Sequence, residues 1–195
     1  MLHLPLNSAL IVVDVQRAID DPKWGPRTNS GAEDRIAAIL SVWRGAQMPV
    51  VHVRHDSVEQ NSSYHPDSPS HAFKAEAAPR AGELVIAKSV NSAFIGTNLV
   101  AKLTELGTTT LIVCGVLTQN SVEATVRHAG NLRYRVFVAA DACWAVDVCD
   151  LTGRIWAAEE VHQLSLANMH GEYATVTNTS ALVMAVAAVR SGGSE

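Results

Sequence analysis

Three side chains with complementary chemistry each follow a short apolar run in this sequence. Asp14 follows residues 9–13, Lys88 follows residues 84–87, and Ser121 lies a few residues beyond residues 110–114. Apolar runs of this length are typical of buried strands. Because open parallel sheets gather ligands beyond the carboxyl ends of their strands, we expect the three side chains to share one site.

Ser121 lies where an apolar strand gives way to a helical pattern. The strand breaks at Gly115, and Val122, Val126 and Ala129 then recur with helical spacing. The amino end of a helix stabilises developing negative charge. Each residue taken alone has a plainer interpretation, since an Asp caps turns, a Lys is solvated and a Ser caps helices. Their coincidence favours a functional site.

The whole chain alternates between strand and helix patterns. Strands are expected at 9–13, 49–53, 84–87, 110–114, 136–140 and 173–176, and helices at 32–46, 97–106, 120–130, 152–169 and from 178 onward. Apolar strands separated by helices indicate a parallel sheet covered on both faces. We therefore expect one α/β domain over residues 1–190, followed by a flexible tail at 191–195.

Composition narrows the classes of protein. The chain has 195 residues, 48% hydrophobic and 17% charged, with a net charge of −4. These values fit a compact domain and give no support for nucleic-acid or anionic-membrane partners. No membrane span or signal peptide is recognisable, so a cytoplasmic protein is expected. The odd set Cys114, Cys143 and Cys149 indicates reduced, mostly buried thiols.

One segment interrupts the alternation. Residues 56–82 are polar and contain Pro66, Pro69 and Pro79. Loops of this length are uncommon in compact domains and are often lids or binding loops. A surface excursion that packs on a neighbouring subunit is an equal alternative.

Several motifs resemble one known family. The turn Gly-Val-x-Thr-x-x-Ser-Val-x-x-Thr, residues 115–125, is similar to the nucleophile turn of the isochorismatase-like cysteine hydrolases, which usually have Cys where this chain has Ser121. Residues 10–16, with Asp14, resemble the family's first strand. Lys88 with residues 92–99 resembles its lysine segment, and Asp141-Ala142 resembles the end of its next strand. The resemblance implies a Rossmann-like, three-layer α/β/α domain with about six mainly parallel strands.

The resemblance also implies roles for individual residues. Asp14 would be the general acid–base, Lys88 would hold that carboxylate ionised and polarise the site, and position 121 would be the nucleophile. A cis peptide bond is implied at Val116-Leu117, and the N–H groups of Leu117 and Ser121 would form an oxyanion hole. The implied reaction is hydrolysis of a C–N bond in a small amide, carbamoyl or ureido compound.

Serine at position 121 leaves alternatives open. A hydroxyl is far less acidic than a thiol and needs a strong base beside it. Lys88 is expected to lower the pKa of Asp14 and so weaken it as a base. Ser121 is then a natural nucleophile, an engineered replacement of Cys, or part of a site without covalent chemistry. In the last case the protein hydrolyses by direct water attack, as the isochorismatase branch does, or only binds a small molecule.

No metal or cofactor is expected. The nicotinamidase branch binds a divalent ion through Asp-x-His and a later His, whereas this chain has His55-Asp56-Ser57 there, with His65 and His71 in the loop. That spacing does not match the metal motif, which argues against nicotinamide as substrate. The chain also lacks the G-x-G-x-x-G dinucleotide motif after its first strand.

Other candidates concern substrate and assembly. Trp24 follows Asp14, Phe94 follows Lys88 and Trp144 follows Asp141. The expected substrate-binding residues are these three aromatics together with Gln16 and Asn120. Packing in the core or at an interface is nearly as good an explanation for each aromatic ring. The family commonly forms oligomers, so a dimer or tetramer is expected, with the apolar helix at 181–189 as a contact face.

Overall fold

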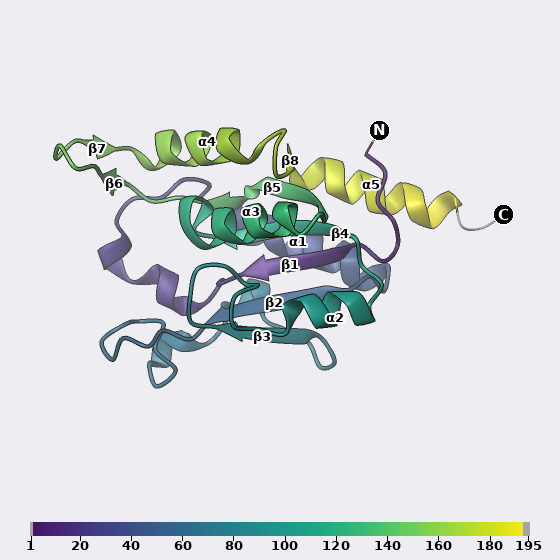
Figure 1. The fold of residues 1–195 in the computed structure, drawn as a ribbon, viewed down its shortest axis with the longest axis horizontal. Helices are drawn as coiled ribbons and strands as arrows, with labels where there is room; N and C mark the ends of the chain where they lie inside the picture. Colours follow the sequence, from purple (N-terminus) through teal and green to yellow (C-terminus); the bar gives the residue numbers. More distant parts are fainter. Residues whose placement is uncertain (1, 193–195) are drawn as a thin grey trace.

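The computed structural model describes residues 2–192 and has a central six-stranded sheet (Figure 1). All neighbouring strands are parallel, in the order β3-β2-β1-β4-β5-β8. The strands are β1 (Ala9–Val13), β2 (Val50–His55), β3 (Leu84–Lys88), β4 (Thr110–Val116), β5 (Arg135–Trp144) and β8 (Thr175–Thr177). The helices are α1 (Ala32–Gly45), α2 (Leu99–Glu105), α3 (Glu123–Asn131), α4 (Ala158–Met169) and α5 (Thr179–Gly192).

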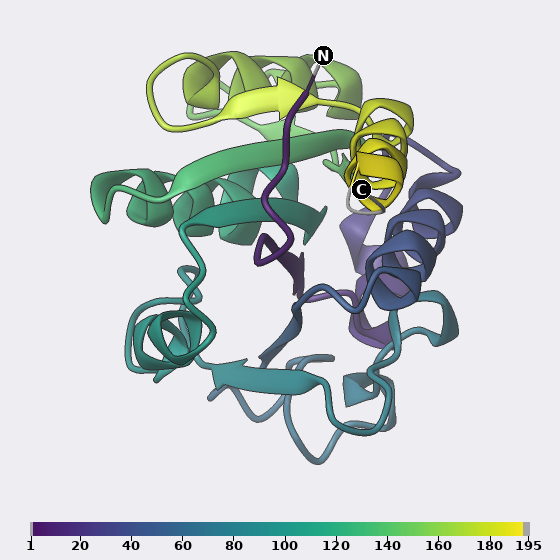
Figure 2. The ribbon, with the colours of Figure 1, turned by 90° about the vertical axis from the view of Figure 1, so that its right-hand side faces the viewer.

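Helices cover both faces of the sheet. Figure 2 shows α1 and α5 side by side on one face, with α2 and α3 on the other, and α4 packs against α3. Every residue of β1 and β4 is buried, as expected for strands covered on both sides. The expected three-layer α/β/α architecture is confirmed.

The chain departs from the expected elements after β5. The sequence predicts a strand ending at 140 and a helix from 152, but β5 continues through Trp144 and α4 begins only at Ala158. A small antiparallel hairpin, β6 (Val148–Cys149) and β7 (Ile155–Trp156), fills the interval. Its turn is held by Asp150, whose carboxylate accepts hydrogen bonds from the N–H groups of Thr152 and Arg154. These local bonds compete with helix formation.

The carboxyl-terminal helix belongs partly to the core. Leu182, Ala185 and Val186 of α5 are buried, whereas Met184 is 66% exposed. One side of this apolar helix is therefore used within the domain and cannot serve as a contact face. Residues 191 and 192 continue α5, and the rest of the expected tail, 193–195, lies outside the described residues. Among the described residues, none of the helices has the length and hydropathy needed to span a bilayer.

The long segment 56–82 is held against the domain. It contains two short 3₁₀ turns, η3 (Pro69–His71) and η4 (Ala75–Ala77). The buried Gln16 side chain donates to the carbonyl oxygens of His55 and His71 and accepts from the His55 N–H. Lys74 N–H donates to the carbonyl of Val15 at 3.0 Å. These bonds fix the segment beside the carboxyl end of β1.

Gly115 permits the close approach of the two central strands. It is the register partner of Val13 in the β1–β4 pair and has φ 120°, a value that favours glycine. A Cβ at this position would collide with the Val13 carbonyl oxygen and lie 2.7 Å from Val13 N. Both strands are fully buried there, so neither can move away easily.

Gly115→Ala is therefore expected to destabilise the domain by about 4 kcal/mol or more, by overpacking combined with an unfavourable φ. Gly82→Ala is the matched control, because Gly82 also has a positive φ of 88° but a Cβ added there would meet no atom within 4 Å. It should cost only about 1–2 kcal/mol. Urea unfolding of both variants measures the difference. Equal losses would contradict the steric argument.

Candidate active site

Asp14, Lys88 and Ser121 meet at the carboxyl edge of the sheet. Lys88 Nζ donates to Asp14 Oδ2 at 2.6 Å and to Ser121 Oγ at 3.3 Å. The side chains of Lys88 and Asp14 are 0% and 6% exposed. The structure thus brings together the three residues that the sequence singled out.

The strand order explains this meeting. β1 and β4 are neighbours, and the chain leaves β1 for β2 on one side but enters β4 from β3 on the far side of β2. Such a reversal in strand order opens a crevice at the carboxyl ends of the two strands. Asp14 follows β1, and Ser121 follows β4 in a π-helical turn, η5 (Thr118–Val122). Lys88 reaches them from β3 across the end of β2.

Burial controls the protonation of Asp14. Removal from water raises the pKa of its carboxyl group above the ordinary value, and the opposing effect of Lys88 is smaller. Lys88 does lower this pKa, as expected, but desolvation outweighs it, so the expected net direction of the shift is wrong. The raised pKa makes Asp14 a better proton acceptor than an ordinary aspartate.

One oxygen of Asp14 remains available. Asp14 Oδ1 is buried and has no hydrogen-bond partner among the described residues. The Ser121 hydroxyl lies near enough to lower the pKa of Asp14, although it does not reach Oδ1 within hydrogen-bonding distance. Since Ser121 Oγ accepts from Lys88, its own proton is free to turn toward Asp14.

The turn after β4 contains the cis peptide bond that the family resemblance implied. The peptide bond Val116-Leu117 is cis. The N–H groups of Asn120 and Val122 both donate to the Leu117 carbonyl, so neither is available to a ligand. Thr118 anchors the turn to α4, because its hydroxyl is 2.9 Å from Nδ1 of the buried His162. The stretch from Asn120 is helical, as expected, but it is π-helical in η5, and the α-helix α3 begins only at Glu123.

A cavity of about 320 Å³ opens onto these residues. Its apolar wall is made by Ile19, Trp24, Val116 and Leu117. The other lining residues are polar or can hydrogen-bond: Asp14, Lys23, His55, Ser57, Glu59, Asn61, Ser62, Tyr64, Asn91, Asn120 and Ser121. The volume suits a small molecule.

Two of the five expected substrate-binding residues, Trp24 and Asn120, line this cavity. Gln16, Phe94 and Trp144, which the structure also describes, do not. Gln16 is fully buried and holds the 56–82 segment. Phe94 stacks on Tyr134, with ring centroids 6.0 Å apart. Trp144 pairs with Val116 in the sheet because β5 is longer than expected, and the Arg27 guanidinium lies 4.4 Å from its ring centroid.

Several lining residues are not recognisable from the sequence as substrate contacts. Tyr64, Ser57 and Asn61 come from the 56–82 segment, whose polar sequence has no periodicity that assigns any one side chain to the cavity. The Tyr64 hydroxyl donates to the Asp14 carbonyl at 3.3 Å, which places the segment over the site. His55 ends β2, but the strand expected from the sequence stops at residue 53, and there His55 is considered only as a metal ligand.

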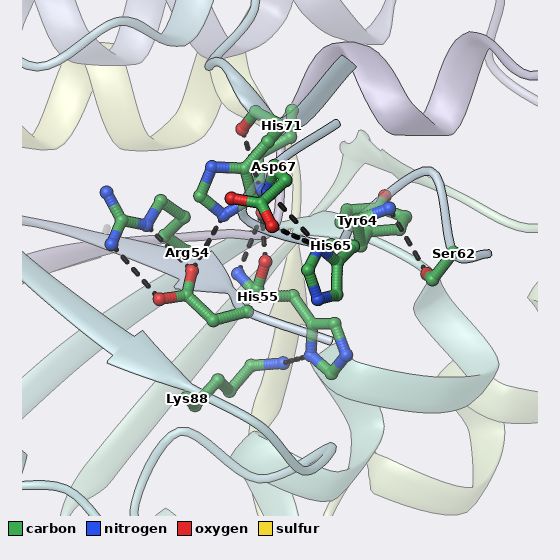
Figure 3. Close-up of polar contacts among 10 residues, drawn as sticks. Arg54, His55, Ser62, Tyr64, His65, Asp67, His71 and Lys88 are labelled. Atoms are coloured by element: carbon green, nitrogen blue, oxygen red, sulfur yellow. Dashed lines mark hydrogen bonds and ion pairs between the residues drawn. The ribbon is translucent and has the colours of Figure 1, made fainter. Parts of the chain in front are cut away.

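The histidines near the site are engaged with other side chains. Figure 3 shows the His55 ring facing Lys88, with 3.1 Å between Nδ1 and Nζ. His71 Nε2 lies 2.8 Å from Asp56 Oδ1, and Asp56 also pairs with Arg54. Among the described residues, no group of three or more His, Cys, Asp or Glu side chains is arranged to hold a metal ion.

Comparison with known proteins assigns the family. The isochorismatase domain matches residues 8–181, so the chain belongs to the isochorismatase family. Members of this family are hydrolases, and this chain is an isochorismatase-family hydrolase.

Similar proteins cover nearly the whole chain. A solved structure of an isochorismatase-family protein from Chromobacterium violaceum is 49% identical with a TM-score of 0.93, covering 96% of this chain and 97% of that one. YrdC of Bacillus subtilis is 40% identical over 91% of this chain and 95% of its own length. Streptothricin hydrolase of Streptomyces noursei is 34% identical over 72% of this chain and 50% of its own length. A Methylobacterium radiotolerans ureidoacrylate amidohydrolase is 30% identical over 55% and 38%.

The native thiols lie away from the nucleophile position. Cys114 and Cys143 are buried, and burial raises the pKa of Cys143 to about 12 and that of Cys114 well above its ordinary value. Cys149, expected among mostly buried thiols, is instead exposed on the β6–β7 hairpin.

We therefore expect only Cys149 to react with a thiol reagent in the folded protein, because thiolate formation and access are both blocked at the other two positions. Titration with Ellman's reagent should give one thiol in the native state and three after unfolding, matching the three cysteines of the sequence. Cys149→Ser should abolish the native signal. A second fast thiol in that variant would contradict the burial of Cys114 and Cys143.

Proposed function

We propose that Asp14, Lys88 and Ser121 hydrolyse a C–N bond of a small amide, carbamoyl or ureido compound through a covalent intermediate. The observation that carries the proposal is the position of Lys88 Nζ, which contacts both Asp14 Oδ2 and Ser121 Oγ at the wall of one cavity. An acid–base group and a nucleophile within reach of one another are the minimum that covalent hydrolysis requires.

In the first half of the reaction, Ser121 Oγ attacks the substrate carbonyl carbon while its proton passes to Asp14. The raised pKa of Asp14 favours this transfer. The carbonyl oxygen becomes an oxyanion, and we assign its stabilisation to the N–H groups of Leu117 and Ser121. Lys88 stays protonated and offsets the negative charge that builds up at Ser121 and the carbonyl oxygen.

In the second half, the tetrahedral intermediate collapses and its C–N bond breaks. Asp14 returns its proton to the leaving nitrogen, which departs as an amine or ammonia. A water molecule then attacks the acyl–Ser121 ester and gives its proton to Asp14. Collapse of this second intermediate releases the acid and restores the serine hydroxyl as it takes the proton back from Asp14.

The substrate class rests on the relatives and on the cavity. One relative is named an amidohydrolase that acts on ureidoacrylate, and another a hydrolase of streptothricin. The cavity of about 320 Å³ combines an apolar wall with Trp24 and amide side chains such as Asn120. This mixture suits a compact molecule with carbonyl and N–H groups.

A second candidate is hydrolysis without a covalent intermediate. The unpartnered Oδ1 of Asp14 favours it, since a buried carboxylate oxygen at the cavity is able to accept a proton from an attacking water. In that case Ser121 would only bind the substrate. A protein that binds a small molecule without turnover is the remaining alternative.

Substitution at position 121 separates these candidates. In a Cys149→Ser background, Ser121→Cys should increase hydrolysis of an amide and ureide panel, because a thiol beside Lys88 ionises far more readily than a hydroxyl. The pKa of the new thiol, measured from the pH dependence of its reaction with iodoacetamide, should lie below about 8.5. Ser121→Ala should lose the acyl adduct seen by intact-protein mass spectrometry.

The control for the new thiol is the parent Cys149→Ser protein, which retains only the buried Cys114 and Cys143. If Ser121→Ala keeps full turnover and the new thiol is no faster than the two buried ones, covalent catalysis at this turn is wrong. Turnover retained in Ser121→Ala would favour water attack, and no turnover in any variant would favour binding alone.

Asp14→Asn should reduce turnover by about 10²–10⁴, the usual effect of removing a general acid–base. In the parent protein, activity should fall with decreasing pH through a pKa above the ordinary aspartate range, because burial raises the Asp14 pKa and only the ionised form accepts a proton. The pH–rate profile and thermal unfolding of both proteins check this. Unchanged turnover in a folded Asp14→Asn would exclude the assignment.

A further inference from the structure

His55 occupies a central place beside the proposed triad. It ends β2, the strand between β3 and β1, and is the register partner of Lys88. Register partners in a parallel pair project to the same face, so His55 and Lys88 lie side by side. His55 lines the cavity together with Asp14 and Ser121.

The donors of Lys88 determine which nitrogen of the His55 ring carries the proton. The Lys88 ammonium has three N–H donors and no acceptor. Its Nζ contacts three atoms: Asp14 Oδ2 at 2.6 Å, His55 Nδ1 at 3.1 Å and Ser121 Oγ at 3.3 Å. His55 Nδ1 must therefore accept with its lone pair, and the ring proton must reside on Nε2.

The Nε2–H group of His55 is available to a ligand. It meets no hydrogen-bond acceptor in the described part of the chain, and His55 is only half-buried. The ring is steadied by an edge contact with Tyr64, whose ring centroid is 5.6 Å away at an interplanar angle of 89°. A fixed N–H donor thus lies at the wall of the cavity.

The surroundings keep this ring neutral. Burial and the neighbouring Lys88 lower the pKa of His55 to about 4, and His71 acts in the same direction. Asp56 is the one opposing carboxylate among the charged groups that shift this pKa. A proton on Nδ1 would point at the Lys88 ammonium and remove one of its three acceptors.

We propose that His55 has two functions: its Nδ1 positions the Lys88 ammonium between Asp14 and Ser121, and its Nε2–H binds an acceptor oxygen of the substrate. The second function rests on the proposed hydrolysis, and the first does not. The substrate then carries a carbonyl, hydroxyl or carboxylate oxygen near the reacting carbonyl. The Lys88 ammonium is thus held by Asp14, His55 and Ser121 together rather than by Asp14 alone.

The first test needs no substrate. Long-range ¹H–¹⁵N correlation spectra of the ¹⁵N-labelled protein, with His55 assigned by comparison with His55→Gln, report which ring nitrogen carries the proton. The expected spectrum is a neutral ring protonated at Nε2 that stays neutral from pH 8 to pH 5, consistent with its pKa of about 4. A ring protonated at Nδ1, or one that titrates near the ordinary value of about 6.5, would overturn the proposal.

The second test separates the two functions by steady-state kinetics with the best substrate of the panel. In His55→Asn, the amide oxygen takes the place of Nδ1 but no donor reaches the position of Nε2. KM should rise about tenfold, the usual scale for one lost hydrogen bond, with kcat nearly unchanged. In His55→Gln, the amide N–H takes the place of Nε2 and the acceptor for Lys88 is lost, so kcat should fall about tenfold with KM nearly unchanged.

The matched controls are His65→Asn and His65→Gln, because His65 lies in the adjoining 56–82 segment but does not line the cavity. Both should keep kcat and KM, and thermal unfolding should show all four variants folded. Equal effects of the two His55 substitutions on kcat and KM, or no effect of either, would overturn the split of functions. If no substrate is turned over at all, the proposed hydrolysis fails, and the spectra still decide the role of His55 toward Lys88.

Discussion

The ammonium of Lys88 and the carboxylate of Asp14 lie 2.6 Å apart with almost no access to solvent. Two charges removed from water each cost several kcal/mol unless their remaining donors and acceptors find partners. Lys88 meets this requirement only because β2 and β3 end together, β1 ends beside Val53 of β2, and η5 follows β4 closely. The site therefore depends on the relative positions of the ends of four strands. Displacement of any one of them leaves a buried charge without a partner.

Two other features preserve this arrangement. Gly115 lets β4 lie against β1 without a Cβ between them, which sets the distance between Asp14 and the turn that carries Ser121. Gln16 binds the backbone of both His55 and His71, so the 56–82 segment closes over the end of β1. Tyr64 from that segment then contacts the Asp14 carbonyl. Water is kept away from the pair by packing, and the same packing raises the pKa of Asp14.

Because position 121 is a serine, the proposed reaction depends strongly on the Asp14 carboxylate as a base. A thiol in the same position would be ionised by Lys88 and the helix end, with little demand on a base. A hydroxyl needs a base to take its proton as it attacks, and the raised pKa of Asp14 supplies a stronger one than the sequence suggested. The desolvation that makes the pair costly thus favours the proposed chemistry.

The sequence by itself determined the strands that are apolar throughout, their alternation with helices and the three residues that follow them, because periodicity and chain order are local properties. The cis bond at Val116-Leu117 came from the family resemblance, not from composition. Only the tertiary structure decided that β5 continues through Trp144, and that Gln16, Phe94 and Trp144 pack away from the cavity. It also decided the direction of the Asp14 pKa and the contact between His55 and Lys88, since burial and register depend on strands far apart in the chain.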